Sequence, residues 1–230
     1  MYRRVLLKLS GEALSGNAEY TVDPDKCKAL AGQLKRLQEA GVQIGVVIGG
    51  GNIFRGSQGV ALGMARVPAD HIGMLATVIN GISLQQTLDQ LGAPARIMSA
   101  LGATEVVEAL DWKRSLRLLD QGVIVVFAGG TGNPFFTTDT NAALRAAQIE
   151  ADVLLKGTKV DGVYDKDPLQ YNDAVRFDKI TYLKALELGV QVMDATAISM
   201  CQENQIPIKV FSLSSLWEGV MDENHGTLVS

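Results

Sequence analysis

The chain has few of the residues from which disulfide-rich proteins and metal sites are built. It contains two cysteines and two histidines among 230 residues. Cys27 and Cys201 are isolated and form no CxxC pair, which excludes a disulfide framework and favours a reduced cytosolic setting. His71 and His225 have no second ligand four residues further on, so a histidine-rich metal site is excluded as well.

Aromatic residues, excess charge and long apolar runs are also scarce. Aromatic side chains make up 6% of the chain and the formal net charge is −4. Aliphatic side chains must therefore fill the core, and the basic face of a nucleic-acid-binding protein is not expected. The apolar start of the chain is interrupted at Lys8, Ser10 and Glu12, far short of a signal or membrane segment. We expect a cytoplasmic protein with neither a nucleic-acid nor a membrane partner.

Glycine and aliphatic residues are plentiful, and they follow an alternating pattern along the chain. Strands are predicted at residues 4–9, 42–48, 95–98, 123–127, 151–156 and 207–211. Helices are predicted at residues 24–40, 69–91, 105–110, 112–120, 140–149, 183–188 and 194–203. Repeated strand–helix alternation with glycine at the strand exits predicts a single α/β domain over residues 1–230. Its expected architecture is a three-layer α/β/α sandwich around an open, mostly parallel sheet.

Four of the predicted strands end in segments that contain glycine, and three of these segments also carry lysine or hydroxyl side chains. These segments are residues 8–11, 49–52, 129–139 and 156–159. Glycine lets backbone N–H groups approach phosphate oxygens closely, and the carboxyl ends of parallel strands meet at one edge of a sheet. Because Lys8, Arg55 and Lys156 add positive charge at that edge, the sequence predicts a polyanionic ligand. Phe135 and Phe136 indicate either a packed structural plug or a ligand that is also flat.

Two common phosphate-binding motifs do not fit these segments. Residues 51–57 have the glycine spacing of a P-loop, but Ser57 stands where that motif requires lysine. Residues 49–54 place Phe54 at the third glycine of the dinucleotide fingerprint. A P-loop enzyme and a nicotinamide dehydrogenase are therefore both poorly supported.

Three aspartates have positions suited either to helix capping or to chemistry. Asp139 closes the third glycine-rich segment, Asp194 lies at a predicted helix start, and Asp70 opens the long helix. Each could be an N-cap. Alternatively, Asp139 and Asp194 could orient lysines or hold Mg²⁺ through water, and Asp70 could accept hydrogen bonds from a ribose diol. Spacing alone leaves both readings open.

Five motifs, taken together, resemble the bacterial UMP kinase family of the amino acid kinase superfamily. They are Lys8-Leu9-Ser10-Gly11-Glu12, Gly49-Gly50-Gly51-Asn52-Ile53-Phe54-Arg55-Gly56, Asp70-His71-Ile72-Gly73-Met74-Leu75-Ala76-Thr77, Gly130-Thr131-Gly132-Asn133-Pro134-Phe135-Phe136-Thr137-Thr138-Asp139 and Lys159-Val160-Asp161-Gly162-Val163-Tyr164. The match runs in order from residue 3 to about residue 229. The first two motifs are shared across the superfamily, whereas the third and fourth are specific to the UMP kinases. Ile72 replaces a more familiar methionine of similar volume.

The resemblance implies MgATP-dependent phosphorylation of UMP to UDP, a step of pyrimidine nucleotide biosynthesis. The catalytic residues that it implies are Lys8, Arg55, Asp139 and Asp194. The ATP-binding residues that it implies are Lys8, Leu9, Ser10, Gly11, Gly51, Arg55, Lys156, Thr158, Tyr164 and Asp167. The UMP-binding residues that it implies are Gly50, Asp70, Thr131, Gly132, Asn133, Pro134, Phe135, Phe136, Thr137 and Thr138. Mg²⁺ would be held through the ATP phosphates, with Asp194 or Asp139 as a protein ligand.

The resemblance also implies an organisation and an assembly. Residues 1 to about 140 would form the acceptor half and residues from about 141 to 230 the ATP-binding half of the domain. The assembly would be a homohexamer, with GTP as an activator and UTP as an inhibitor. Residues 15–22, where relatives place glycine-rich residues linked to the GTP response, are variable here, so activation stays open. His71 and Arg96 are interpreted as surface charges rather than effector ligands.

Two other functions remain as alternatives. One is a kinase of the same superfamily that acts on a carboxylate or carbamate, which the Phe135–Phe136 pair and Asp70 argue against. The other is a non-catalytic nucleotide- or oxyanion-binding protein on the same fold. That alternative predicts loss of the catalytic lysine or aspartates, whereas Lys8, Asp139 and Asp194 are all present.

Overall fold

The computed structural model describes residues 2–16, 21–102, 105–190 and 192–230. The strands are β1 (Arg4–Leu9), β2 (Gln43–Ile48), β3 (Ala95–Ser99), β4 (Glu108–Ala109), β5 (Ile124–Ala128), β6 (Val153–Thr158), β7 (Val163–Tyr164), β8 (Arg176–Phe177), β9 (Lys179–Ile180), β10 (Ile208–Ser212) and β11 (Thr227–Val229). The α-helices are α1 (Pro24–Glu39), α2 (Gly56–Ala61), α3 (Arg66–Gln90), α4 (Trp112–Asp120), α5 (Thr138–Gln148), α6 (Tyr182–Leu188), α7 (Ala195–Glu203) and α8 (Leu216–Met221). Short 3₁₀ turns cover Gly11–Leu14 and Leu213–Ser215.

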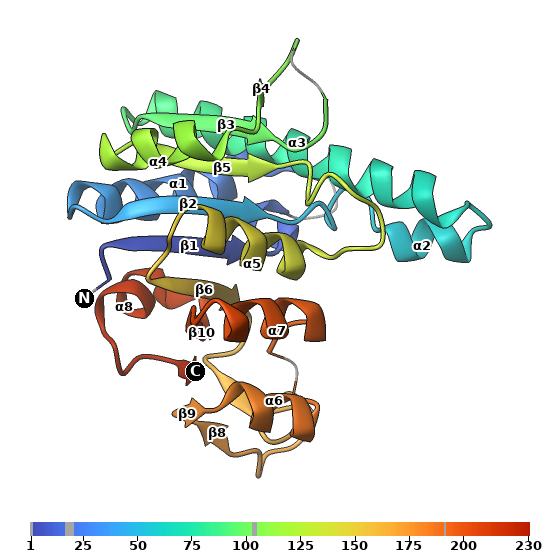
Figure 1. Cartoon of the computed structure of the whole chain (residues 1–230), viewed down its shortest axis with the longest axis vertical. Helices are drawn as coiled ribbons and strands as arrows, with labels where there is room; N and C mark the ends of the chain where they lie inside the picture. The colour runs from blue at the N-terminus through green and yellow to red at the C-terminus, as the bar shows by residue number, and fades with distance from the viewer. Residues whose placement is uncertain (1, 17–20, 103–104, 191) are drawn as a thin grey trace.

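One nine-stranded sheet runs through the molecule in the order β4-β3-β5-β2-β1-β6-β10-β11-β9 (Figure 1). Its neighbouring strands pair in parallel except for β10 and β11, which are antiparallel. The strands β7 and β8 form a separate antiparallel ribbon. The predicted α/β class with an open, mostly parallel sheet is therefore confirmed.

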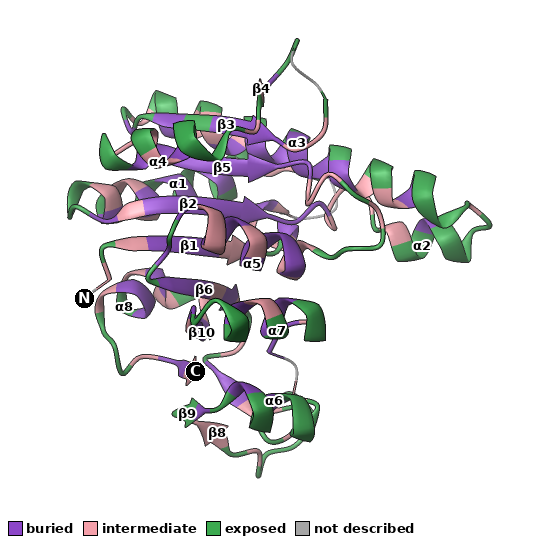
Figure 2. Cartoon of the chain, viewed as in Figure 1, coloured by how far each residue is buried: buried purple, intermediate pink, exposed green. Residues whose placement is uncertain are grey.

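The two faces of the sheet are buried under different helices, which makes three layers. Leu7 of β1 joins a core cluster with side chains from α1, α3 and α8. The preceding residue, Leu6, points to the other face and joins a second cluster with side chains from α4, α5, α6 and α7. This alternation follows from the two-residue period of a strand. Figure 2 shows the central strands buried and the outer helical surfaces exposed.

Most predicted elements form, with shifted ends. Asp23 caps α1 by accepting from the backbone N–H groups of Asp25 and Lys26, and Pro24 begins the helix, as predicted. The long helix α3 begins at Arg66, so the residue that caps it is Ala65 and not Asp70. The short elements β7, β8, β9 and β11 were not predicted, because two or three residues carry no readable period.

The predicted helix at residues 105–110 is wrong. In the structure this segment is a turn followed by β4, whose two residues pair with Met98 and Ser99 of β3. Val107 is 4% exposed and its neighbour Val106 is 69% exposed. Two adjacent β-branched residues also lower the helix propensity of this segment.

The long helix α3 carries apolar side chains on both sides. Ile72, Leu75, Ile79 and Ile82 are between 37% and 50% exposed on its outer face. No helix of the described residues is long and apolar enough to cross a membrane.

Candidate active site

The centre of the site is an aspartate between two lysines of adjacent strands. Lys8 of β1 and Lys156 of β6 are direct partners in the parallel register. Asp139, the second residue of α5, meets both of them. Its Oδ1 lies 2.7 Å from the Lys8 Nζ and its Oδ2 lies 3.2 Å from the Lys156 Nζ. Because a carboxylate accepts from both lysines, their ammonium groups are held side by side at the carboxyl edge of the sheet.

Burial and charge shape the ionisation of this cluster. Burial alone would raise the pKa of Asp139, but the positive charges of Lys8 and Lys156 outweigh it and hold that pKa below its ordinary value. Burial lowers the pKa of Lys156, and Asp139 opposes the shift only in part. The N-cap reading of Asp139 is wrong, because the residue that caps α5 is Thr137.

Asp194 stands next to this cluster but is held differently. It caps α7, where its Oδ1 accepts from the Ala197 N–H at 2.9 Å. Its carboxylate also accepts from the hydroxyls of Thr137, which caps α5, and of Thr140 on α5. Asp194 therefore ties α7 to the helix that carries Asp139. No ion pair joins it to a lysine within the described ranges.

A second charged cluster lies along the glycine-rich rim. Glu12 accepts from Arg55 and lies 2.7 Å from the Lys159 Nζ. Its pKa is lowered, first by the hydrogen bond from Lys159. Arg55 Nε also donates to the Gly51 carbonyl at 3.2 Å. Sequence reasoning gave Glu12 and Lys159 no individual role, although both lie within the recognised motifs.

The backbone at this rim is packed too closely for side chains. A Cβ at Gly11 would come within 2.5 Å of the Gly49 carbonyl oxygen. Leu9 is fully buried, and its carbonyl accepts from the Gly49 N–H at 2.9 Å. Of the predicted ATP-binding residues, Leu9 thus has its side chain in the core. Ser10 is exposed and caps the Gly11–Leu14 turn.

A cavity of about 260 Å³ opens on one side of Asp139, between the glycine-rich rim, α3 and the segment after β5. Of the predicted acceptor residues, those that line it are Gly50, Asp70, Asn133, Phe136, Thr137 and Thr138. The lining residues that sequence reasoning did not assign are Phe54, Gly56, Ser57, Arg66, Gly73, Met74, Thr77 and Gly130; Gly51 and Arg55, predicted for ATP, line it too.

Asp70 links the helix to the predicted acceptor segment. Its Oδ2 accepts from the Phe135 backbone N–H at 2.8 Å and from the Arg66 Nε at 2.7 Å. Phe135 has a positive φ of 73° and is 62% exposed, and it does not line the cavity. Thr131 lines a different hollow near Ser99. The structure therefore brings only part of the predicted acceptor segment into this cavity.

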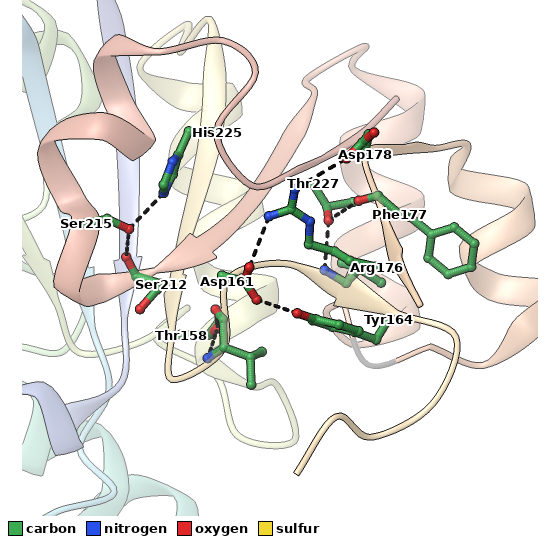
Figure 3. Close-up of polar contacts among 12 residues, drawn as sticks. Thr158, Asp161, Tyr164, Arg176, Phe177, Asp178, Ser212, Ser215, His225 and Thr227 are labelled. Carbon is green, nitrogen blue, oxygen red and sulfur yellow. Dashed lines mark hydrogen bonds and ion pairs between the residues drawn. The ribbon is translucent and has the colours of Figure 1, made fainter. Parts of the chain in front are cut away.

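A larger cavity of about 540 Å³ lies on the other side, beyond β6. All of Lys156, Thr158, Tyr164 and Asp167, predicted for ATP, line it. The Tyr164 hydroxyl donates to Asp161 Oδ1 at 2.6 Å, which raises the pKa of the tyrosine (Figure 3). Arg176 of β8 donates to the other oxygen of Asp161 at 3.0 Å. These contacts fix one wall of the cavity on the β7–β8 ribbon.

The two cavities and the charges between them define a protein that brings two anionic ligands together over a pair of lysines. Lys156 lines the larger cavity and Thr138, the neighbour of Asp139, lines the smaller one. That arrangement suits phosphoryl transfer, which requires positioning and positive charge more than covalent chemistry. The chain belongs to the Amino acid kinase family, which it matches over residues 3–212.

Proteins similar to this chain indicate which kinases of the family it resembles. A uridylate kinase from Protochlamydia amoebophila (strain UWE25) is 52% identical to this chain, over 99% of this chain and 92% of its own length. The crystal structure of UMP kinase from Ureaplasma parvum superposes with a TM-score of 0.94 at 36% identity, covering 100% of this chain and 99% of that one. The UMP kinase from Bacillus anthracis superposes with a TM-score of 0.95 at 34% identity, covering 100% and 96%. The recognised resemblance to this family is confirmed.

Proposed function

We propose that this chain is an enzyme that transfers the γ-phosphate of ATP to UMP and so produces UDP for pyrimidine nucleotide biosynthesis. The observation that carries the proposal is the pair of lysines around Asp139, placed between two cavities of unequal size. Near-full-length similarity to uridylate kinases supports UMP as the acceptor.

In this proposal the larger cavity takes the adenosine of ATP. Tyr164 lies along the base, while Thr158 and Asp167 face the ribose and base edges, since all three line the cavity. The triphosphate then runs toward Lys8, along the backbone N–H groups of Ser10, Gly11 and Gly51. In this proposal the chain is a single domain, and residues from about 141 to 230 form most of its ATP-binding half.

The smaller cavity takes UMP. Asp70 accepts from the ribose hydroxyls, and Asn133, Phe136, Thr137 and Thr138 surround the nucleotide, with Phe136 against the base. The remaining members of that segment, Thr131, Gly132, Pro134 and Phe135, shape its path. Arg55 lines the smaller cavity and would contact the phosphates at the point of transfer.

The reaction requires no covalent intermediate. At neutral pH a phosphate oxygen of UMP already carries the negative charge needed for attack, so the enzyme mainly aligns two anions. Lys8 and Lys156 neutralise charge on the transferring group. Asp139 keeps the two ammonium groups together against their mutual repulsion. Asp194 fixes the position of α5 relative to α7, and so the position of Asp139.

Magnesium enters this account with ATP. No group of three or more His, Cys, Asp or Glu side chains suited to a metal occurs in the part of the chain that the structure describes. Asp139 is engaged by two lysines, which leaves Asp194 as the better candidate for a water-mediated contact. These residues fit a Mg²⁺ ion held chiefly by phosphate oxygens, the usual arrangement for this metal. The ion would neutralise phosphate charge at the transfer point.

The apolar outer face of α3 supports assembly with further copies of the chain, and we propose the homohexamer. Ile72, Leu75, Ile79 and Ile82 follow one another at helical spacing and are half-exposed. A continuous row of this kind is rare on a monomer surface and common at an interface.

The family resemblance implies two effectors, which we add to the proposal. UTP shares its uridine with UMP, so we propose that it inhibits the enzyme, and that GTP activates it. Residues 17–20, in the segment linked to the GTP response, lie outside the described residues.

We also propose a cytoplasmic location, because Cys27 and Cys201 are buried free cysteines.

An acceptor panel tests the proposed function. ADP release from MgATP is measured with UMP, CMP, dUMP, N-acetylglutamate, aspartate and carbamate offered separately. UMP should give the dominant turnover. Dominant turnover of an acidic metabolite would assign the chain to a carboxylate or carbamate kinase, and binding without any turnover would make it a non-catalytic nucleotide-binding protein.

A further inference from the structure

Two buried polar side chains on α3 contact the loops that border the smaller cavity, and one of them, Thr77, also lines it. Thr77 and Asn80 lie about one turn apart on this helix and are 6% and 0% exposed. A buried polar side chain is unfavourable unless it is hydrogen-bonded. Both side chains find partners outside the helix, and each partner belongs to a different glycine-rich loop. This pattern indicates a role beyond filling the core.

Thr77 contacts the start of the segment after β5. Its hydroxyl donates to the Met74 carbonyl at 2.6 Å, and its oxygen accepts from the Gly129 N–H at 2.8 Å. Gly129 has a φ of +75° and sits so close to β3 that a Cβ would come within 2.6 Å of the Ser99 Oγ. Without the Thr77 oxygen, the buried Gly129 N–H would lose its partner at the point where the acceptor segment leaves the sheet.

Asn80 contacts the other loop. Its Nδ2 donates to the Gly49 carbonyl at 2.7 Å and to the Asn52 Oδ1 at 2.8 Å. The Asn52 side chain returns a hydrogen bond to Asn80 Oδ1 at 3.1 Å. Gly50, between them, rests on the same helix, since a Cβ there would come within 2.7 Å of the Gly73 carbonyl oxygen. The loop from Gly49 to Asn52 thus contacts α3 at Gly49, Gly50 and Asn52.

We propose that Thr77 and Asn80 are positioning residues for substrate binding, each through a different loop. Thr77 fixes the acceptor segment through Gly129 and so serves UMP alone. Asn80 fixes the loop that carries Gly50 and Gly51 and so serves both UMP and ATP. This inference rests on the proposed function for the identity of the substrates, while the two loop attachments rest on the contacts alone.

The first test compares Thr77→Val with Thr87→Val. Thr87 lies on the same helix, and its hydroxyl donates to the Ser83 carbonyl at 2.8 Å, so the control makes the same chemical change away from the loops. Thr77→Val should raise the KM for UMP about tenfold, the size expected from one buried hydrogen bond. Its KM for ATP should stay within about twofold of the wild type, and Thr77→Ser should restore the KM for UMP. Equal KM values in both valine variants would overturn the assignment.

A second readout needs no substrate. Exchange of the Gly129 amide hydrogen should be faster in Thr77→Val than in wild type and unchanged in Thr87→Val. If the wild type does not phosphorylate UMP, the proposed function fails, while this exchange still decides whether Thr77 holds the loop. If Thr77→Val folds poorly, Thr77→Cys replaces it. The thiol is a weak acceptor, so an intermediate rise in exchange is expected and no rise contradicts the proposal.

Asn80→Asp tests the other loop. It keeps the shape and the acceptor of asparagine but removes the donor to the Gly49 carbonyl. The KM for ATP and the KM for UMP should both rise. A rise in the KM for UMP alone would show that the two loops are not separately positioned, and would contradict the division of roles between Thr77 and Asn80.

Discussion

Lys8 and Lys156 share one carboxylate, and their roles can be separated by mutation. Lys8→Ala should lower kcat by about 10²-fold or more, the size seen when one preorganised charge is removed from a transfer site. Folding should change far less, because Asp139 keeps Lys156 as a partner. Lys184→Ala, on an exposed residue of α6 that pairs with Glu187, is the control. ADP release and thermal unfolding measure the two effects, and near-normal turnover by Lys8→Ala would make the catalytic assignment wrong.

The lowered pKa of Lys156 predicts an alkaline limit to activity. Because the folded-state pKa lies below the ordinary 10.5, Lys156 loses its charge at a lower pH than an exposed lysine does. The stability of the protein changes in the other direction over the same pH range. The unfolded chain binds the Lys156 proton more tightly than the folded chain does, so the free energy of unfolding rises with pH there.

The profile of kcat/KM against pH reports the free enzyme. It should fall on the alkaline side below pH 10.5, while thermal unfolding at each pH shows the protein still folded. A flat profile up to that pH would contradict the assigned role of Lys156.

At the scale of the element, the loops depend on glycine where they rest on α3. Gly50→Ala would place a Cβ within 2.7 Å of the Ala76 Cβ and of the Gly73 carbonyl oxygen. We expect it to lower the free energy of unfolding by about 1–3 kcal/mol. Gly32 lies exposed within α1 and its Cβ would meet nothing within 4 Å, so Gly32→Ala should stabilise by about 0.5–1 kcal/mol. Denaturant unfolding compares the two, and equal effects would show that Gly50 is not packed as described.

The elements also show how far the sequence could be read. Lys8 and Lys156 each lie near the carboxyl end of a strongly apolar strand. Their proximity at one edge of a parallel sheet was therefore predictable. The N-cap alternative for Asp70 is wrong, because the helix begins four residues earlier, at Arg66, without a side-chain cap to mark the start. The contact between Thr77 and Gly129 spans 52 positions, and no local spacing carries such a contact.

Residues whose neighbours are set by the tertiary fold were the hardest to place. Arg66 and Phe54 line the smaller cavity because α3 and the loop after β2 lie next to each other there. Thr131 was expected at the acceptor but faces another hollow. A run of consecutive motif residues cannot show which of its members turn inward.

At the scale of the whole molecule, the exposed row on α3 predicts assembly through this helix. Leu75→Glu should shift the protein to smaller species in size-exclusion chromatography with light scattering, because a charge would be buried in the apolar contact. Leu183→Glu is the control, since Leu183 is 61% exposed on α6, far from α3 (Figure 1). An unchanged hexamer-sized species in Leu75→Glu would place the interface elsewhere.

The central claim is that the smaller cavity selects UMP as the phosphoryl acceptor. Equimolar UMP, CMP and dUMP are mixed with limiting MgATP, and the diphosphate products are separated by chromatography. Their ratios give the relative kcat/KM values directly. UDP should dominate the products. Comparable amounts of CDP or dUDP, or ADP formed without any nucleoside diphosphate from the acceptors, would contradict it.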